Sequence, residues 1–334
     1  MRKLLKVLGA LVLVVVLVVA TIAGINAYNT KRYAVPGSTD LQDKSTYEIN
    51  AQVKSIEGDY LNGFHFTPSE RKHRGTVVVF GGSEGSPSYQ QAKAISEQGY
   101  EVLSLFFFGQ PNQQESLAEV PLEFFDEVTK YLDSGVPDPQ PVTVIGSSKG
   151  AELTANLAAR GARMDNIVLY TPSEYTYQGL SFGREEHSSF TKDGQPVPYL
   201  SFRDAEPKAS SKMFFDMMLG LPTAYRATYE SMPERAANAE DARIPIANFQ
   251  GKGLLFAGEQ DAMWQGDVAA RGLAERNPNL EAHVYPNAGH IFSEDITTFG
   301  RSWEKMLGGT VEGNRTAKQE SDKVLLAKLA EWHG

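Results

Sequence analysis

A short buried strand that runs directly into Gly146-Ser147-Ser148-Lys149-Gly150 is the feature that most restricts how this chain folds. The strand is Val142–Ile145, and a helix-forming segment, Ala151–Arg160, follows at once. A serine at such a tight turn is held in a strained backbone conformation, and small residues two positions to either side prevent clashes with the sheet and helix. The hydroxyl of Ser148 would then lie at the sheet edge, placed to act as a nucleophile. The alternative is the glycine-rich turn of a nucleotide-binding fold, but the sequence contains no G-x-G-x-x-G or Walker-type pattern to support it.

Short apolar runs alternate with helical patterns along most of the chain, which predicts a mostly parallel sheet with helices on both faces. With the serine turn, this alternation predicts the α/β-hydrolase fold, a member of the α/β class. Strands are expected at Tyr47–Ile56, Tyr60–Phe66, Thr76–Phe80, Glu101–Phe107, Val142–Ile145, Asn166–Tyr170, Gly253–Phe256 and His283–Tyr285, the first two as a hairpin. Helices are expected at Tyr89–Gln98, Leu117–Leu132, Ala151–Arg160 and Ser321–Trp332.

The interval from about Ser173 to Gln250 does not follow this alternation of strands and helices. We interpret it as a cap inserted over the edge of the sheet that carries Ser148. Its apolar stretch Met213–Leu221 would either line an acyl pocket or form the packed core of the cap.

The G-x-S-x-G pattern occurs a second time, at Gly81-Gly82-Ser83-Glu84-Gly85. Ser83 also follows a buried strand, but Pro87 comes soon after it and no long helix starts immediately. This position, one β–α unit before the serine turn, is where such folds place the loop that binds an oxyanion. We therefore expect the backbone N–H groups of Ser83 and Lys149 to form an oxyanion hole. A plain glycine-rich turn is the alternative.

His290 is the best placed of the six histidines to act as a general base. It stands in a glycine-containing loop, Pro286–Phe292, directly after the last strand, whereas His283 falls within that strand. A general base must present its ring near the nucleophile, and a loop at this edge of the sheet allows that. No metal site or cofactor is expected, because the histidines lack H-E-x-x-H or other ligand spacing.

Asp261 follows the strand Gly253–Phe256 and is the expected acid of the site. A carboxylate there can accept a hydrogen bond from the histidine and stabilise the imidazolium that forms during the reaction. The chain order Ser148, Asp261, His290 is the order of nucleophile, acid and base in these hydrolases. Glu259 is an alternative acid, and so is Glu174, because some hydrolases place the acid one strand earlier.

The N-terminal segment predicts a membrane anchor. The uncharged run Val7–Ile25 would be roughly 28 Å long as a helix, close to the hydrocarbon thickness of a bilayer. A cleavable signal peptide is the alternative, although its apolar core is usually shorter. Basic residues before the run favour an inside N-terminus and an extracytoplasmic catalytic domain, a bias weakened by basic residues on the other flank. These basic residues are Arg2, Lys3 and Lys6 before the run, and Lys31 and Arg32 after it.

The remaining organisation follows from these boundaries. We expect the basic flank and anchor at residues 1–29, a polar linker at 30–44 that contains Pro36-Gly37-Ser38, and the hydrolase domain at 45–334 with its cap at about 173–250.

Composition excludes several classes of protein. The formal net charge of −9 repels polyanions, so a nucleic-acid partner is not expected. The absence of cysteine excludes disulfide scaffolds, cysteine-ligated metals and a cysteine nucleophile.

Three segments, Val144–Leu153, Gly258–Trp264 and Tyr285–His290, resemble the C-terminal domain of the bile acid-CoA:amino acid N-acyltransferase and acyl-CoA thioesterase family. The resemblance implies cleavage of an acyl thioester through an acyl-enzyme on Ser148. In that family a cysteine nucleophile goes with transfer to amino acids and a serine with hydrolysis. The stretch Tyr47–Thr76 is too short for the β-sandwich domain that eukaryotic members carry, and an outward-facing domain would not meet acyl-CoA.

The sequence therefore predicts a membrane-anchored serine hydrolase that acts on a small-molecule acyl ester or thioester. Transfer of the acyl group to an amine or alcohol is the second hypothesis. A catalytically silent hydrolase scaffold used for binding is the third.

Overall fold

The computed structural model describes residues 2–35, 40–181 and 185–334. Its helices, in chain order, are α1 (Arg2–Tyr33), α2 (Tyr89–Ser96), α3 (Phe124–Gly135), α4 (Lys149–Ala159), α5 (Pro207–Met218), α6 (Arg226–Arg235), α7 (Ala239–Ala242), α8 (Gly266–Arg276), α9 (Trp303–Met306) and α10 (Val311–His333). Its strands are β1 (Val53–Glu57), β2 (Asn62–Phe66), β3 (Thr76–Phe80), β4 (Glu101–Phe106), β5 (Val120–Pro121), β6 (Val142–Ser147), β7 (Asn166–Tyr170), β8 (Phe190–Lys192), β9 (Gln195–Pro196), β10 (Lys252–Gly258) and β11 (Leu280–Tyr285).

An eight-stranded sheet in the order β1-β2-β4-β3-β6-β7-β10-β11 forms the centre of the molecule. The hairpin β1–β2 joins it antiparallel to β4, and all pairs from β4 to β11 are parallel. The inner strands are apolar on both faces, as expected of a sheet that helices cover on both sides. The fold is the predicted α/β-hydrolase fold.

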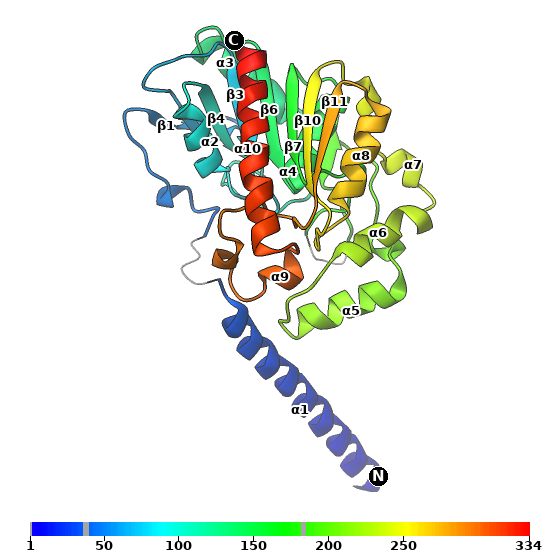
Figure 1. Ribbon diagram of the computed structural model, residues 1–334. Helices are drawn as coiled ribbons and strands as arrows, with labels where there is room; N and C mark the ends of the chain where they lie inside the picture. The colour runs from blue at the N-terminus through cyan, green and yellow to red at the C-terminus, as the bar shows by residue number, and fades with distance from the viewer. Residues whose placement is uncertain (1, 36–39, 182–184) are drawn as a thin grey trace.

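Helices cover both faces of this sheet (Figure 1), and an apolar core lies on each face. On one face, α3, α4 and α8 pack against side chains that include Val144, Leu169 and Leu255. On the other face, α2 and α10 pack against alternate residues of the same strands, such as Ile145 and Val168. The sheet is thus held rigidly, which fixes the loops that leave its carboxyl edge.

Two predicted helices have wrong boundaries. Leu117–Glu123 is not helical: Glu119 has a φ of 55°, and Val120 pairs with Phe190 in the small sheet β5-β8-β9. Pro121 contributes to this difference, because the residue before a proline avoids the helical region. In contrast, the last helix begins ten residues earlier than expected, at Val311, where the Thr310 side chain accepts a hydrogen bond from the N–H of Gly313.

Helix α1 is long, apolar and almost wholly exposed. The segment Lys3–Tyr33 is long and apolar enough to cross a membrane, and none of its most apolar window is buried. Because the helix continues to Tyr33, it covers the first residues of the expected linker. The predicted turn Pro36-Gly37-Ser38 lies outside the described residues.

The interval expected to be a cap contains α5, α6, α7 and the strands β8 and β9. A separate apolar cluster holds part of it together, built around Tyr177, Tyr229, Met232 and Trp264. The apolar stretch Met213–Leu221 does not belong to this core. Phe214, Phe215 and Met217 are exposed, so the expectation that this stretch forms the packed core of the cap was wrong.

Candidate active site

Ser148 lies at the sharp turn between β6 and α4, with φ 54° and ψ −118°. Such a conformation costs a non-glycine residue about 1–3 kcal/mol and persists only where its surroundings enforce it. The flanking glycines explain how the turn is possible. A Cβ on Gly146 would lie 2.1 Å from the carbonyl oxygen of Gly150, and one on Gly150 would lie 2.0 Å from that of Gly81. The turn therefore requires glycine at both positions.

Ser148, His290 and Asp261 form one chain of hydrogen bonds. The His290 Nε2 lies 2.9 Å from the Ser148 Oγ, and its Nδ1 lies 2.8 Å from the Asp261 Oδ2. An ionised carboxylate only accepts, so Nδ1 carries the proton and donates to Asp261. This tautomer leaves Nε2 free to accept the proton of the serine hydroxyl. Asp261 and His290 are buried, whereas Ser148 is partly exposed.

The Asp261 carboxylate is held in place by its own loop. Its Oδ1 accepts hydrogen bonds from the backbone N–H groups of Met263, at 2.7 Å, and Trp264, at 3.2 Å. Its Oδ2 is therefore the oxygen left to face His290. The indole of Trp264 is fixed in turn, because its Nε1 donates to the carbonyl oxygen of Thr171 at 3.1 Å. Its ring packs edge-on against the imidazole, with 5.8 Å between the ring centroids.

A loop that the sequence did not single out joins the histidine and aspartate loops. The carbonyl oxygen of Leu307 accepts from the N–H of His290 at 2.7 Å and from that of Ala262 at 3.4 Å. Asn314, at the start of α10, accepts from the N–H of Gly289 at 2.8 Å. A Cβ on Gly308 would lie 1.9 Å from the carbonyl oxygen of Gln260. The pair of glycines at 308 and 309, just after a short helix, was the only sequence signal of this loop.

The two alternative acids lie in other ion pairs. Glu174 contacts the guanidinium groups of Arg243 and Arg276, and Glu259 contacts Arg271 at 2.8 Å. Among the described residues, Asp261 is the carboxylate bonded to His290.

The second G-x-S-x-G segment lies beside the serine turn. A Cβ on Gly82 would lie 3.2 Å from the Cβ of Ser148. Gly82 to Gly85 form a turn, closed by a hydrogen bond from the N–H of Gly85 to the carbonyl oxygen of Gly82. The Gly82 N–H donates a hydrogen bond to the carboxylate of Glu84. Ser83 is exposed on this turn, and the His290 imidazole bonds to Ser148 instead.

Lys149 follows the serine directly, and its side chain is buried. Its Nζ lies 2.8 Å from the Oε2 of Glu152, one turn along α4, and 3.0 Å from the Oγ of Ser189. Burial lowers the pKa of Lys149 and raises the pKa of Glu152, while the attraction between the two charges opposes both shifts. As the first residue of α4, Lys149 has a backbone N–H without a partner inside the helix.

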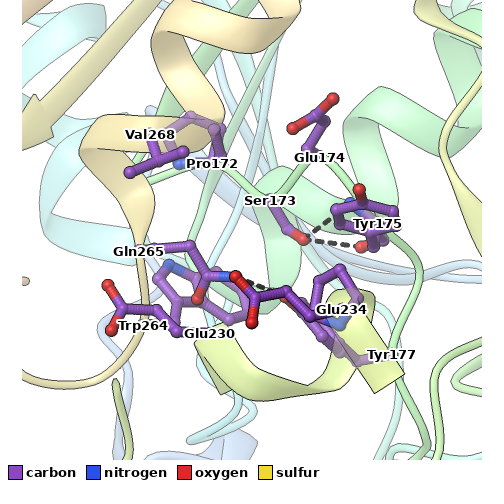
Figure 2. A pocket seen from close by; sticks show the side chains of 12 residues that line it. Pro172, Ser173, Glu174, Tyr175, Tyr177, Glu230, Glu234, Trp264, Gln265 and Val268 are labelled. Carbon is purple, nitrogen blue, oxygen red and sulfur yellow. Dashed lines mark hydrogen bonds between the residues drawn. The ribbon is translucent and has the colours of Figure 1, made fainter. Parts of the chain in front are cut away.

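A cavity of about 370 Å³ lies beside the site (Figure 2), and Trp264, which packs against His290, is one of the residues that line it. Figure 2 shows Trp264 and Gln265 on one side and the segment Ser173–Tyr175 on the other, with Glu230 and Glu234 beside them. Its lining combines aromatic rings with several carboxylates. Negative charge in the lining disfavours a polyanion in this cavity.

Two of the other histidines contact neighbouring side chains of the fold. His65 is buried and bonds to Glu101 and Tyr131, and His283 lies within β11 beside Phe256. In the part of the chain that the structure describes, no group of three or more histidine and acidic side chains is arranged to hold a metal ion.

A parallel sheet with a strained serine turn, and with an aspartate and a histidine bonded in series at its carboxyl edge, defines an α/β-hydrolase. Residues 120–294 match the sequence model of the family described as BAAT / Acyl-CoA thioester hydrolase C terminal. The chain belongs to this family, as the resemblance of its motifs predicted.

Named relatives agree with this assignment, and a solved structure shares the fold. The chain is 31% identical to human acyl-coenzyme A thioesterase 6, over 67% of this chain and 50% of the relative. It is 23% identical to mouse acyl-coenzyme A amino acid N-acyltransferase 1, over 75% of this chain and 56% of the relative, so it spans about half the length of these curated proteins. Its fold is similar to that of an esterase from Pyrococcus furiosus, with a TM-score of 0.50 and 14% identity over 90% of this chain and 96% of that one.

Proposed function

We propose that this protein is a serine hydrolase that cleaves acyl esters or thioesters through an acyl-enzyme on Ser148 and is held to a membrane by α1. The observation that carries the catalytic proposal is the hydrogen-bond chain from Ser148 through His290 to Asp261. Each residue in it has the hydrogen-bond partner that nucleophilic catalysis requires, and the contact with Asp261 favours the His290 tautomer whose Nε2 can accept a proton.

The reaction begins when the Ser148 Oγ attacks the acyl carbonyl carbon and its proton passes to the His290 Nε2. Asp261 stabilises the imidazolium that forms and keeps the ring oriented. The tetrahedral intermediate collapses, the bond to the leaving oxygen or sulfur breaks, and the imidazolium protonates the leaving group. A water molecule then gives its proton to His290, attacks the acyl-enzyme and releases the acid, so that Ser148 recovers its proton.

The backbone N–H groups of Ser83 and Lys149 are the proposed donors to the negatively charged oxygen of this intermediate. Two features support this role. The loop that carries Ser83 packs against Ser148 at Gly82, and Lys149 is the first residue of a helix, where N–H groups are free and the helix dipole favours negative charge.

The substrate class rests on the relatives, whose names describe thioesterases and an N-acyltransferase that use acyl-coenzyme A. A serine nucleophile supports hydrolysis over transfer, by analogy within the family. If α1 spans a bilayer with the domain outside, acyl-CoA is not the physiological substrate and another acyl ester or thioester is. Residues 1–29 would then be the anchor, 30–44 a linker and 45–334 the hydrolase domain with its cap at about 173–250.

A fluorophosphonate probe tests the catalytic proposal on the full-length protein in detergent. The probe should label Ser148, and the variant Ser148→Ala should take up none. Absence of labelling on the wild type would instead favour a silent scaffold used for binding. A panel of acyl esters and acyl-CoA esters of graded chain length then identifies the leaving group. Competition between water and added amines or alcohols separates hydrolysis from transfer.

A further inference from the structure

Helix α5 exposes apolar side chains to the outside and buries an acidic one. Phe214, Phe215 and Met217 are exposed at 61%, 55% and 42%, while Asp216 is the one residue of this helix that is buried. A helix on the surface of a protein in water has the opposite arrangement, with its apolar face against the core. The two phenylalanine rings contact each other edge-to-face at 6.0 Å, so they form one aromatic patch.

The buried acidic residue of α5 forms two ion pairs. The Asp216 carboxylate contacts the ammonium of Lys212 on its own helix and that of Lys305 on α9, the latter at 3.5 Å. The ion pair with Lys305 therefore links the inner face of α5 to α9, while the phenylalanines of α5 stay exposed. A continuous exposed apolar patch of this kind marks a surface that contacts another apolar phase.

The C-terminal part of α1 is hydrogen-bonded to the C-terminal end of α5. The side-chain amide of Asn26 donates to the carbonyl oxygen of Met218 at 3.0 Å, and that of Asn29 donates to the carbonyl oxygen of Leu219 at 2.9 Å. These are last-turn carbonyls of α5, which have no partner within their own helix. Gly220 ends α5 with a φ of 64°, and a Cβ there would lie 2.8 Å from the carbonyl oxygen of Asn26. The C-terminal end of α5 is thus fixed against α1.

The contact lies at the end of the apolar run of α1. Asn26 is the first residue after Val7–Ile25, so the end of α5 lies within one or two helical turns of the boundary of the hydrocarbon layer. Helices that lie in a membrane surface insert by about 5–10 Å, which is a similar depth. Tyr28 is 65% exposed at this level, where membrane proteins are rich in aromatic side chains.

Six basic residues belong to elements at this end, although the whole chain carries a net charge of −9, and two of them, Lys212 and Lys305, also pair with Asp216. The six belong to α1, α5 and the region of α9, and are Lys31, Arg32, Lys208, Lys212, Arg301 and Lys305. Basic side chains beside an apolar face favour a surface that contains anionic lipids.

The candidate active site lies at this end as well. Figure 1 shows α1 leaving the molecule beside α5 and α9, opposite the C-terminus and α3. The loop of His290 is hydrogen-bonded to Leu307, directly after α9. The carboxyl edge of the sheet therefore faces the side on which a membrane would lie.

We propose that α5 is an interfacial helix that rests on the lipid bilayer, so that the cap is held against the membrane and the site takes its acyl substrate from the lipid phase. The inference rests on the proposed anchoring by α1, and it adds a second contact and a substrate class, an acyl lipid resident in the bilayer.

Labelling at single cysteines tests the position of α5, because the natural chain contains no cysteine. The full-length variants Phe215→Cys and Ser134→Cys each receive an environment-sensitive fluorophore. Ser134 is an exposed residue of α3, at the other end of the domain. Both are reconstituted into vesicles of phosphatidylcholine and phosphatidylglycerol that contain phosphatidylcholine with brominated acyl chains. The fluorophore at position 215 should lose most of its emission, and the one at position 134 should keep it.

The alternatives give different results. A protein that floats with the vesicles but shows no quenching at position 215 is anchored with α5 in water, which overturns the inference and leaves the anchor intact. Disulfide formation between two copies of the unlabelled Phe215→Cys variant, with no quenching of the labelled one, assigns the patch to a dimer and overturns the inference too. A protein that does not float rejects the anchor and the inference together. None of these measurements needs enzymatic activity, so they stand apart from the catalytic proposal.

A kinetic comparison tests the route of the substrate. The double variant Phe214→Ser/Phe215→Ser should hydrolyse an acyl ester embedded in vesicles several-fold more slowly relative to a water-soluble ester of short chain. Leu326→Ser is the matched control, since Leu326 is an exposed apolar residue of α10. An unchanged ratio in the double variant would show that the patch plays no part in the supply of substrate.

Discussion

The backbone N–H of Tyr177 donates a 3.0 Å hydrogen bond to Glu152, the carboxylate that also pairs with Lys149. Tyr177 belongs to the first segment of the cap interval, and Lys149 follows the candidate nucleophile directly. One buried carboxylate therefore connects the serine turn to the cap. The Lys149 ammonium also lies 5.8 Å from the centroid of the Tyr177 ring. Burial raises the pKa of the Tyr177 hydroxyl well above its usual value.

Glu152→Gln should therefore destabilise the protein by about 3–5 kcal/mol, because it leaves the Lys149 ammonium buried without its counter-charge. Denaturant unfolding measures this loss. The stability of the variant should rise toward alkaline pH, since the unfolded chain binds a proton that the buried lysine resists. Asp133→Asn, which breaks the exposed pair with Arg163, is the control and should change the stability little, because solvent screens this pair. Equal losses of stability in the two variants would show that burial does not make the Lys149–Glu152 pair more important than an exposed ion pair.

Ser148→Ala should reduce turnover by a factor on the order of 10⁵–10⁶, because covalent catalysis is lost. Ser83→Ala keeps the backbone N–H and should have a small effect. Ser83→Pro removes that N–H, at the second position of a turn, which accepts proline. It should reduce turnover by about 10²–10³ with little change in stability. The kcat of each purified variant checks these values. Equal activity of the proline and alanine variants would remove Ser83 from the oxyanion hole.

Asp261→Asn should keep the fold but reduce turnover by about 10⁴, because an amide can donate to Nδ1 and favour the wrong imidazole tautomer. Glu174→Gln is the comparison, since Glu174 faces Arg243 and Arg276. Steady-state kinetics with circular dichroism as a folding check distinguishes the two. If the Glu174 variant were inactive and the Asp261 variant active, the acid would follow β7 instead of β10.

The sequence predicted the parallel sheet and the relative placement of Ser148, Asp261 and His290 because these features depend on local rules. A turn in which Cβ atoms at positions 146 and 150 would clash admits only glycine, and this requirement is visible in the sequence. Strands such as Thr76–Phe80 are apolar throughout, so their burial on both faces could be predicted as well.

Features that depend on distant contacts could not be predicted. The pairing of Lys149 with Glu152 matters because residues of the cap bury it. The first half of α10 is polar, and an amphipathic pattern begins only near its middle, so its start was missed. The stretch Met213–Leu221 is apolar, but composition does not tell whether a helix faces a protein core or a lipid phase. Only the placement of α5 against α1 separates these cases.

The stability of the protein should fall as the pH drops below about 6.5 through the effect of His333. Burial lowers the pKa of this histidine, whose Nδ1 lies 2.8 Å from the carbonyl oxygen of Arg74 and whose Nε2 lies 2.8 Å from the Thr143 hydroxyl. Below the ordinary histidine value of 6.5, the unfolded chain binds a proton that the folded chain does not, so acid favours unfolding. Urea unfolding at a series of pH values should show this slope, and His333→Gln should reduce it. A variant with the wild-type slope would assign the effect to other groups.

The last prediction concerns α1. If Val7–Ile25 spans a bilayer, the full-length protein should remain in the membrane fraction through high salt and alkaline carbonate and leave only with detergent. Val14→Arg/Val18→Arg should release it, because each arginine near the centre of a span costs about 2.5–3.5 kcal/mol. A cleaved signal peptide would instead give a soluble protein whose first residue lies near Gly24 or Tyr28. Protease added to intact spheroplasts should trim the domain if it faces outward. Protection until lysis would place the domain inside, where acyl-CoA becomes the leading substrate candidate.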